Sequence, residues 1–475
     1  MRIALLLLCA VAVQAAEFRV GAGLADHQVF QRNAQNAADI KVGGTAEGLA
    51  GKPIEARILA GTKPVKGWSW KSIATVGGAT WTGVLTSVPM GGPYNIEFRS
   101  TGATPVVVKD VLVGDLWILA GQSNMEGVGD LENVQAPDPR VHSFDQLDRW
   151  LIAEEPLHNL PGAVDRVHWR GKPPVRLTGQ ELETYNKERK KGAGLGLPFA
   201  VEMTRRTGVP VGLIPCAHGG TSMAQWDPAL KDKGGDSLYG AMIRRFQAIG
   251  GKAAGVLWYQ GEAEANPQAS SVFADKFTDF VAAVRRDFAQ PDLPFYYVQI
   301  GRYVSTASPR EWNAVQEAQR VLGDKIPKSG VVAAIDFGLD DQIHVGTPGL
   351  KSLGIRLANL ATAKAKSPNV ISARYEPVAG AFGLIKVQFA NVTGKLQADG
   401  RISGFGLYTP AGEWIPAIFR ADVDPAEGST ILLHVNGKIP EGAVLHYGFG
   451  RDPFCNLRDE SDMGVLVFGP LPVSR

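Results

Sequence analysis

Four short segments of the chain carry residue types that together could perform acyl transfer. They are GQSNM at residues 121–125, CAHGGTS at 216–222, WYQGE at 258–262 and DDQIH at 340–344. A serine nucleophile needs a base to take its proton and an acid to orient that base. Ser123 could be the nucleophile and His344 the base, and the three-residue spacing from Asp341 can bring a carboxylate onto the imidazole Nδ1.

The second and third segments offer donors for the oxyanion that forms when a serine attacks an ester. Paired glycines let backbone N–H groups approach a ligand closely, which suits Gly219 and Gly220. Gln260 could contribute its side-chain amide. His218 could line the same pocket, and Glu262 could contact the substrate.

Each of these residues also has a plainer interpretation when it is taken alone. Ser123 could cap a helix, the glycine pair could form only a tight turn, and Gln260 could bond to nearby loop backbone. Glu262 and Asp341 could be ordinary caps, and the histidines could be packed or solvated. The occurrence of all four segments in one chain favours the acyl-transfer site. The sequence holds no HExxH, CxxC, Walker or GxGxxG pattern, so we expect no metal and no cofactor.

The elements that must position these segments have the pattern of buried strands alternating with helices. Short, almost wholly apolar runs occur at residues 116–120, 209–215, 253–259, 295–300 and 331–335. Helical patterns lie between them, and the clearest is at residues 272–288, where apolar side chains recur with a period of 3.6. Such alternation predicts an α/β fold with an open parallel sheet, whose chemistry sits at the carboxyl ends of the strands.

The first 16 residues have the pattern of a signal peptide. A basic start and an apolar run precede small residues, which predicts cleavage after Ala15 or Ala16. No second apolar run is long enough to span a bilayer, so we expect an exported protein, periplasmic or secreted, with no membrane span. Cys9 would leave with the signal, and Cys216 and Cys455 could form a bridge only if their segments meet.

The remaining chain divides by pattern into three parts. We expect a β-sandwich module at residues 17–110, the α/β catalytic domain at 111–370, and at 371–475 a C-terminal β module or strands that complete the first. Residues 128–195 are polar and rich in Pro and Gly, which predicts long loops over one end of the sheet. The net charge of +2 over 475 residues gives no electrostatic argument for a nucleic-acid partner.

The four segments resemble those of the SGNH hydrolase superfamily and, more closely, of the sialate O-acetylesterase family. The family shares the blocks GQSNM, GLI…GGT…W, WYQGE and IH, which here begin at residues 121, 212, 258 and 343. Further likeness occurs at residues 26–32, 91–94, 109–115 and 453–457, so it covers nearly the whole mature chain. The resemblance implies a flavodoxin-like parallel sheet with helices on both faces.

The resemblance also implies roles for individual residues. Ser123 matches the nucleophile and His344 the base, and the oxyanion hole would comprise the Ser123 N–H, the Gly220 N–H and the Gln260 side chain. Gly219 is the alternative donor if the loop register differs, and Gly219, His218, Glu262 and Asn124 are candidate substrate contacts.

The triad acid is less well defined by the resemblance. Many relatives have a carboxylate two residues before the histidine, where this chain has Gln342, and often a proline after it, where this chain has Val345. Asp341, at the spacing common in the wider superfamily, is the expected acid, and Asp340 is the alternative.

The resemblance implies removal of acetyl groups from a sugar through an acetyl-enzyme, with O-acetylated sialic acid as the implied substrate. Relatives also deacetylate xylan or xyloglucan fragments, and the sequence does not separate these substrates. A non-catalytic carbohydrate-binding protein on a hydrolase scaffold is the rival from another class. The intact Ser, Gln and His argue against it.

Overall fold

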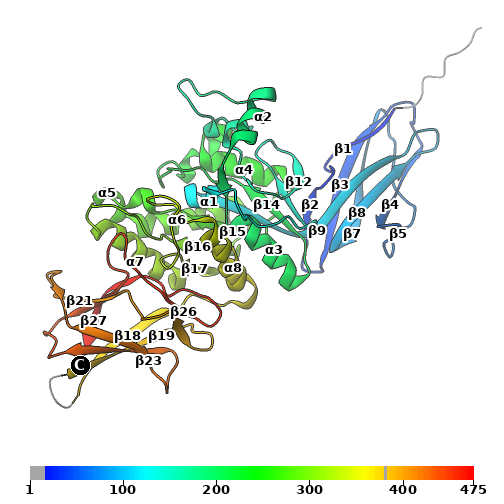
Figure 1. The fold of residues 1–475 in the computed structure, drawn as a ribbon. Coiled ribbons are helices and arrows are strands. Elements are labelled where there is room, and N and C mark those ends of the chain that lie inside the picture. Colours follow the sequence, from blue (N-terminus) through cyan, green and yellow to red (C-terminus); the bar gives the residue numbers. More distant parts are fainter. Residues whose placement is uncertain (1–16, 379–381) are drawn as a thin grey trace, which may run out of the picture. The chain divides into compact units, whose positions relative to one another are not determined.

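The computed structural model describes residues 17–378 and 382–475, and the chain divides into two compact units after Val113 (Figure 1). The predicted signal peptide lies outside the described residues. In the part of the chain described, no helix is long and apolar enough to cross a membrane. Each unit has its own arrangement of strands.

The first unit consists of two antiparallel sheets around one apolar core. One sheet has the order β1 (Phe18–Ala22), β3 (Ala37–Ala46), β7 (Thr80–Pro89). The other comprises β2 (Val29–Gln31), β4 (Pro53–Ala60), β5 (Lys63–Pro64), β6 (Lys71–Thr75), β8 (Gly91–Arg99) and the start of β9 (Val106–Gly121). Alternate side chains of β4, at Ile54, Ala56 and Ile58, are fully buried. This period of two is what a half-buried strand requires.

The second unit is built on a parallel sheet. Its strand order is β12 (Trp150–Ile152), β11 (Val141–Phe144), β14 (Val211–Pro215), β9, β15 (Gly255–Tyr259), β16 (Phe295–Gln299), β17 (Ser329–Ala333). All neighbours pair in parallel except β12 with β11. The five strands expected from the apolar runs are all present, and every residue of β14 and β15 is buried.

Amphipathic helices cover this sheet. They are α3 (Gly196–Thr207), α4 (Leu238–Ala248), α6 (Phe273–Asp287), α7 (Arg310–Lys325) and α8 (Thr347–Ala363), with the short α5 (Pro267–Ser270) and η3 (Pro228–Asp236) between them. The apolar stripe of α6 packs on β15, where the rings of Phe280 and Trp258 lie 4.7 Å apart. Helices α3 and α8 pack against each other, as do α6 and α7.

Residues 128–195 contain more regular structure than the long loops predicted. They form β10 (Gly129–Asp130), β11, β12, η1 (Leu160–Gly162), η2 (Arg166–His168), α2 (Gly179–Glu188) and β13 (Lys191–Ala193). Strand β11 is a parallel strand of the main sheet, and all four of its residues are buried. It lacks an apolar run because His142 and Ser143 occupy its centre, so its sequence does not show its burial.

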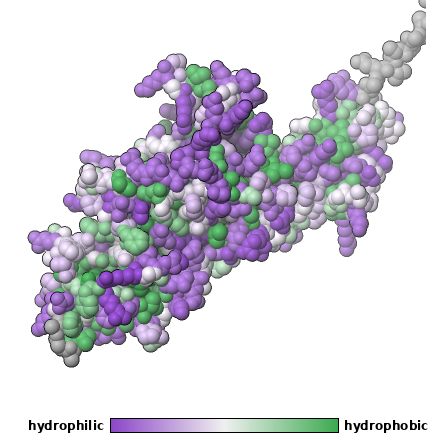
Figure 2. All heavy atoms as spheres, viewed as in Figure 1, coloured by the Kyte–Doolittle hydropathy of each residue, from purple (hydrophilic) through white to green (hydrophobic). Residues whose placement is uncertain are grey.

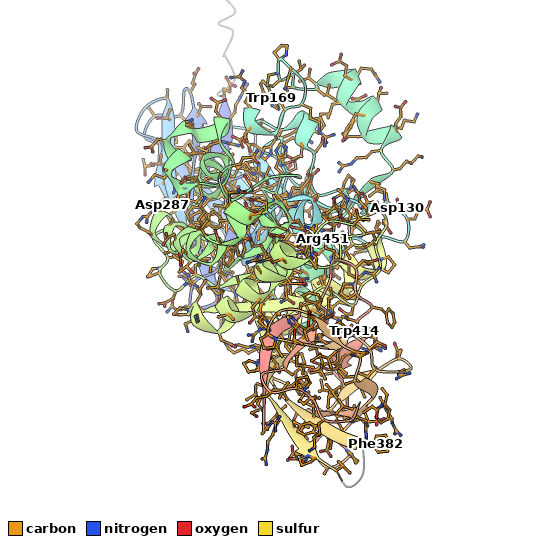
Figure 3. The ribbon with its side chains drawn as sticks, turned by 90° about the vertical axis from the view of Figure 1, so that its left-hand side faces the viewer. Asp130, Trp169, Asp287, Phe382, Trp414 and Arg451 are labelled. Atoms are coloured by element: carbon orange, nitrogen blue, oxygen red, sulfur yellow. The ribbon has the colours of Figure 1, made fainter. Side chains whose placement is uncertain are left out.

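The C-terminal strands form an eight-stranded sheet and a two-stranded ladder within the second unit. The sheet order is β22 (Trp414–Ile415), β21 (Phe405–Tyr408), β25 (Val444–Tyr447), β27 (Phe468–Ser474), β18 (Asn369–Pro377), β19 (Phe382–Ala390), β24 (Thr430–Asn436), β23 (Ile418–Val423), and β20 (Leu396–Ala398) pairs with β26 (Leu457–Asp459). Arg451, which is labelled in Figure 3, lies over the ring of Trp312 on α7, and its Nε donates to the Ser308 carbonyl.

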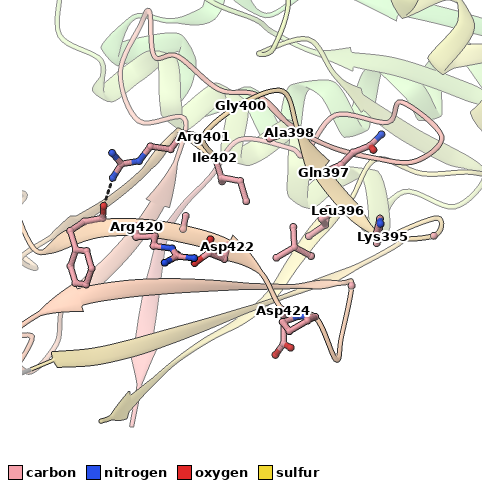
Figure 4. Close-up of a pocket in the computed structure, with 16 residues that line it drawn as sticks. Lys395, Leu396, Gln397, Ala398, Gly400, Arg401, Ile402, Arg420, Asp422 and Asp424 are labelled. Atoms are coloured by element: carbon pink, nitrogen blue, oxygen red, sulfur yellow. Dashed lines mark hydrogen bonds and ion pairs between the residues drawn. The ribbon is translucent and has the colours of Figure 1, made fainter. Parts of the chain in front are cut away.

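The surface of the C-terminal strands carries exposed aromatic side chains and a groove. Phe382 and Trp414 are exposed there (Figure 3), and apolar patches interrupt the hydrophilic surface (Figure 2). A groove of about 1100 Å³ lies along β20 and β23, with Arg401, Arg420 and Asp422 among its lining residues (Figure 4). It includes no residue of the four predicted segments. Cys216 and Cys455 are both buried and unpaired, so they form no bridge.

Candidate active site

The first segment begins where β9 ends beside β15. Gly121 has a φ of +131°, and a Cβ at this position would lie 2.3 Å from the Tyr259 carbonyl oxygen, so no side chain fits. The next N–H, of Gln122, donates to the same oxygen at 2.8 Å. Ser123 then opens the short helix α1 (Ser123–Glu126) and is partly exposed. The tight turn therefore presents the hydroxyl-bearing residue at the carboxyl end of the central strand.

His344 and Asp341 form a direct hydrogen bond. The imidazole Nδ1 lies 2.7 Å from Asp341 Oδ2, while Asp341 Oδ1 accepts the N–H groups of Ile343 and His344 at 2.9 Å each. Partial burial acts to raise the pKa of Asp341, but these hydrogen bonds outweigh it and lower the pKa to about 2. The carboxyl is therefore ionised at neutral pH, and the pairing leaves the Nε2 of His344 for another partner.

Asp340 faces different partners. Its Oδ2 accepts the N–H of Asp130 at 3.2 Å and lies 3.8 Å from the Lys191 ammonium. Asp130 lies on β10 (Figure 3), so Asp340 connects the histidine loop to β10 and β13. Of the two neighbouring carboxylates, Asp341 is the one that bonds to the imidazole.

Asn124 joins three of the four segments. Its Nδ2 donates to Glu262 Oε1 at 2.9 Å, and its Oδ1 accepts the Val345 N–H at 3.0 Å. Because Asn124 follows Ser123 and Val345 follows His344, this side chain connects the serine turn to the histidine loop. Its side chain is buried, and both its amide nitrogen and its amide oxygen are hydrogen-bonded to these segments.

Glu262 opens η4 (Glu262–Glu264) and is enclosed by the same residues. Burial raises its pKa, and the Asn124 hydrogen bond and the nearby His344 oppose that rise. Its second carboxylate oxygen, Oε2, is buried and has no hydrogen-bond partner among the residues that the structure describes. Glu262 therefore holds the Asn124 amide with one oxygen, while the other oxygen is enclosed without a hydrogen bond.

The glycine loop that follows β14 is held by hydrogen bonds on both sides of Gly220. The Ala217 N–H donates to His158 Nε2, the His218 N–H to the Gly121 carbonyl and the Gly219 N–H to Glu126 Oε2 at 2.7 Å. Further along, Met223 N–H donates to Glu264. Within the described parts of the chain the Gly220 N–H has no acceptor.

Gly219 lies against the serine. A Cβ built on Gly219 would stand 3.3 Å from the Ser123 Cβ and 2.9 Å from Glu126 Oε2, so a side chain there would disturb both. Its own N–H is already used by Glu126, which removes Gly219 as the alternative oxyanion donor. Gly220, at a φ of +71°, faces open space and keeps its N–H free.

Gln260 is fully buried, and its amide hydrogens are already engaged. Its Nε2 donates to the Thr221 carbonyl at 3.3 Å and to the Glu264 carboxylate. Both neighbours are acceptors, so the nitrogen must face them and the Oε1 faces away without a partner. In this structure both amide hydrogens of Gln260 are directed at these acceptors, and its role as an oxyanion donor stays a prediction.

His218 packs against a histidine that the sequence pattern did not single out. Its Nδ1 lies 3.2 Å from the Nδ1 of His168, and the two rings stack with centroids 5.3 Å apart. Burial and the charge of Arg170 lower the pKa of His218 to about 4, and burial lowers that of His158 to about 3. Neutral imidazoles thus support the glycine loop, and one ring nitrogen of His218 lies against His168.

Sequence reasoning missed the residues that hold this loop: Glu126, His158, His168 and Glu264. In the sequence, each of these polar residues is expected to face solvent, and no motif spacing indicates a contact with the glycine loop. The structure shows no group of three or more His, Cys, Asp or Glu side chains placed to hold a metal ion, within residues 17–378 and 382–475.

Comparison with known proteins assigns the family. The model of the carbohydrate esterases described as sialic acid-specific acetylesterases matches residues 113–363. The chain belongs to this family. Its members are carbohydrate esterases, so the protein is a carboxylic ester hydrolase, and the matched region contains all four segments of the site.

Relatives of this carbohydrate esterase include plant and mammalian proteins. A probable carbohydrate esterase of Arabidopsis thaliana is 29% identical over 282 residues, which cover 54% of this chain and 92% of that protein. The sialate O-acetylesterase of Rattus norvegicus is 24% identical over 61% of this chain, and the match spans 63% of its length. A carbohydrate acetylesterase from Xanthomonas citri shares the fold over 95% of this chain and 98% of its own, with a TM-score of 0.63 and 23% identity.

Proposed function

We propose that this esterase removes O-acetyl groups from carbohydrates through an acetyl-enzyme, with Ser123, His344 and Asp341 as the catalytic triad. One observation carries the proposal: Asp341 holds the imidazole Nδ1 at 2.7 Å in a loop that Asn124 attaches to the serine turn. The strand order β14-β9-β15-β16-β17 supports an SGNH-type, flavodoxin-like sheet, in which Ser123 and Glu262 follow adjacent strands where the chain order reverses.

Ser123, His344 and Asp341 each have a separate role in the proposed reaction. Ser123 Oγ attacks the acetyl carbonyl carbon while His344 Nε2 takes the hydroxyl proton, and Asp341 stabilises the imidazolium that results. The C–O bond to the sugar breaks, and His344 returns the proton to the leaving sugar oxygen. Water then attacks the acetyl-enzyme while His344 takes its proton, the bond between the acetyl carbon and Ser123 Oγ breaks, His344 returns the proton to that oxygen, and acetate leaves.

The Ser123 and Gly220 N–H groups are the proposed oxyanion donors. Neither has a protein acceptor among the described residues, whereas Gly219 and Gln260 already donate elsewhere. Two preorganised N–H donors are enough to lower the barrier substantially, since one such donor contributes about 10²–10³ in kcat. Gln260 could join them only by leaving Glu264 or Thr221.

O-acetylated sialic acid is the proposed substrate, and acetylated xylan or xyloglucan fragments are the alternative. The family description and the name of the rat relative support the first. Acetate release from O-acetylated sialic acid, acetylxylan and acetylated xyloglucan oligosaccharides, measured side by side, decides between them. We expect the highest kcat/KM with the sialic acid ester.

The triad is tested by Ser123→Ala. The variant should lose more than 10³-fold in kcat with p-nitrophenyl acetate while it keeps the unfolding temperature of the wild type, because the serine supplies the nucleophile and little packing. Wild-type turnover of the variant would contradict the triad. Wild-type protein that releases no acetate from any of these esters would favour a carbohydrate-binding protein on a hydrolase scaffold.

A further inference from the structure

The side chain of Glu126 connects the nucleophile helix to the glycine loop. Glu126 lies three residues after Ser123 on α1, and only 7% of the residue is exposed. Its Oε2 accepts the Gly219 N–H at 2.7 Å. A single short helix thus presents the serine and, through this carboxyl, holds the residue that precedes the free Gly220 N–H.

The loop needs such a support because it is made of two adjacent glycines. Gly219 has no room for a Cβ next to Ser123, and Gly220 adopts a φ of +71°, so neither can carry a side chain that restrains the peptide between them. Glycine leaves the backbone more freedom than any other residue. Fixing the Gly219 N–H removes part of that freedom at the residue before the proposed donor.

We propose that Glu126 is a positioning residue, which aligns the Gly220 N–H with the oxyanion by holding the Gly219 N–H. The inference rests on the proposed function, because it assigns a role within that oxyanion hole. Glu126 does not touch the reacting atoms; it acts through the backbone of the glycine loop.

The role requires an acceptor atom and not a negative charge. An ionised carboxylate close to a forming oxyanion would oppose catalysis. Burial raises the pKa of Glu126, although the hydrogen bond from Gly219 and the charges of Arg170 and Arg189 act to lower it. A carboxyl oxygen accepts an N–H in either protonation state. A glutamine of the same shape should therefore perform the role, and an alanine should not.

The test compares Glu126→Ala and Glu126→Gln with the wild type. The amount of active enzyme is titrated by the acetyl-enzyme burst with p-nitrophenyl acetate, and kcat and KM are then measured per active site. We expect Glu126→Ala to lower kcat about 10–100-fold with KM changed less than about threefold, since a misaligned oxyanion donor acts on the transition state. Glu126→Gln should stay within about fivefold of the wild type and keep its pH–rate profile.

Glu155 supplies a matched control. It is a partly buried glutamate whose carboxylate accepts two backbone N–H groups, of Leu157 and Gly194, outside the glycine loop. We expect Glu155→Ala and Glu126→Ala both to lower the unfolding temperature, but Glu155→Ala should keep kcat per active site within about threefold.

Three results would overturn the inference while the esterase remains active: wild-type kcat in Glu126→Ala, an equal loss in Glu126→Gln and Glu126→Ala, or an equal kcat loss in Glu155→Ala. A wild-type protein with no esterase activity would instead refute the proposed function, so the two failures are distinguishable.

Discussion

Replacement of Asp341 by Asn tests the geometry of the proposed triad most directly. The substitution keeps the shape of the side chain but turns an acceptor that faces His344 Nδ1 into an amide that can donate to it. A donor at this position favours the tautomer with its proton on Nε2, which cannot take a proton from Ser123. The expected effect is therefore on kcat, with a small change in KM.

The expected loss in kcat depends on how exposed the Asp341 carboxylate is to solvent. The lowering of the Asp341 pKa from 3.8 to about 2, after allowance for the solvent screening of a side chain that is 43% exposed, corresponds to about 1 kcal/mol in the ground state. The bond strengthens when the imidazole becomes charged, because charge-assisted hydrogen bonds are about twice as strong as neutral ones. A buried triad loses about 10⁴ in kcat by the same exchange, so we expect a loss of about 10²–10³ here.

The assay is the steady-state hydrolysis of p-nitrophenyl acetate at about pH 7.5. The size of the acetyl-enzyme burst gives the concentration of active sites, from which kcat is calculated. Asp340→Asn is the matched control, since Asp340 has the same residue type at the adjacent position but bonds to Asp130 and faces Lys191. It should keep kcat within about threefold of the wild type. A large loss in Asp340→Asn with a small one in Asp341→Asn would refute this assignment of the acid.

Two further predictions concern the turn and the glycine loop. Gly121→Ala should lower the free energy of unfolding by about 3 kcal/mol or more and abolish activity, because its Cβ would lie 2.3 Å from a carbonyl oxygen. The control Gly102→Ala, at a φ of +91° with open space around it, should lower the free energy of unfolding by only about 1 kcal/mol. Similar unfolding temperatures for the two variants would contradict this prediction. The lowered pKa of His218, about 4 against 6.5, contributes stability that is complete above about pH 6.5 and is lost as the pH falls toward 4. Urea unfolding at pH 7 and pH 5 should therefore show the stability advantage of the wild type over His218→Gln shrinking by about 2 kcal/mol, and an unchanged difference would argue against a neutral buried ring.

Short strands of low polarity were predictable because burial on both faces leaves few alternatives to apolar residues. The runs that became β14 and β15 carry this signal, whereas β11 does not, since His142 and Ser143 interrupt it. A polar residue at the centre of a strand does not show, from a local pattern alone, that the strand is buried on both faces.

The sequence by itself determined the residue types of the site and the strands they follow. Serine, paired glycines and the Asp-x-x-His spacing are local features, and Asp341 meets His344 within one turn of chain, so this contact needs little from the rest of the fold. The tertiary structure decided which backbone N–H groups remain free. Glu126 accepts the Gly219 N–H across 93 residues of chain, which leaves the Gly220 N–H as the free one of the pair. Such choices depend on where every competing acceptor lies, because a buried donor takes an acceptor within reach whatever its sequence neighbours suggest.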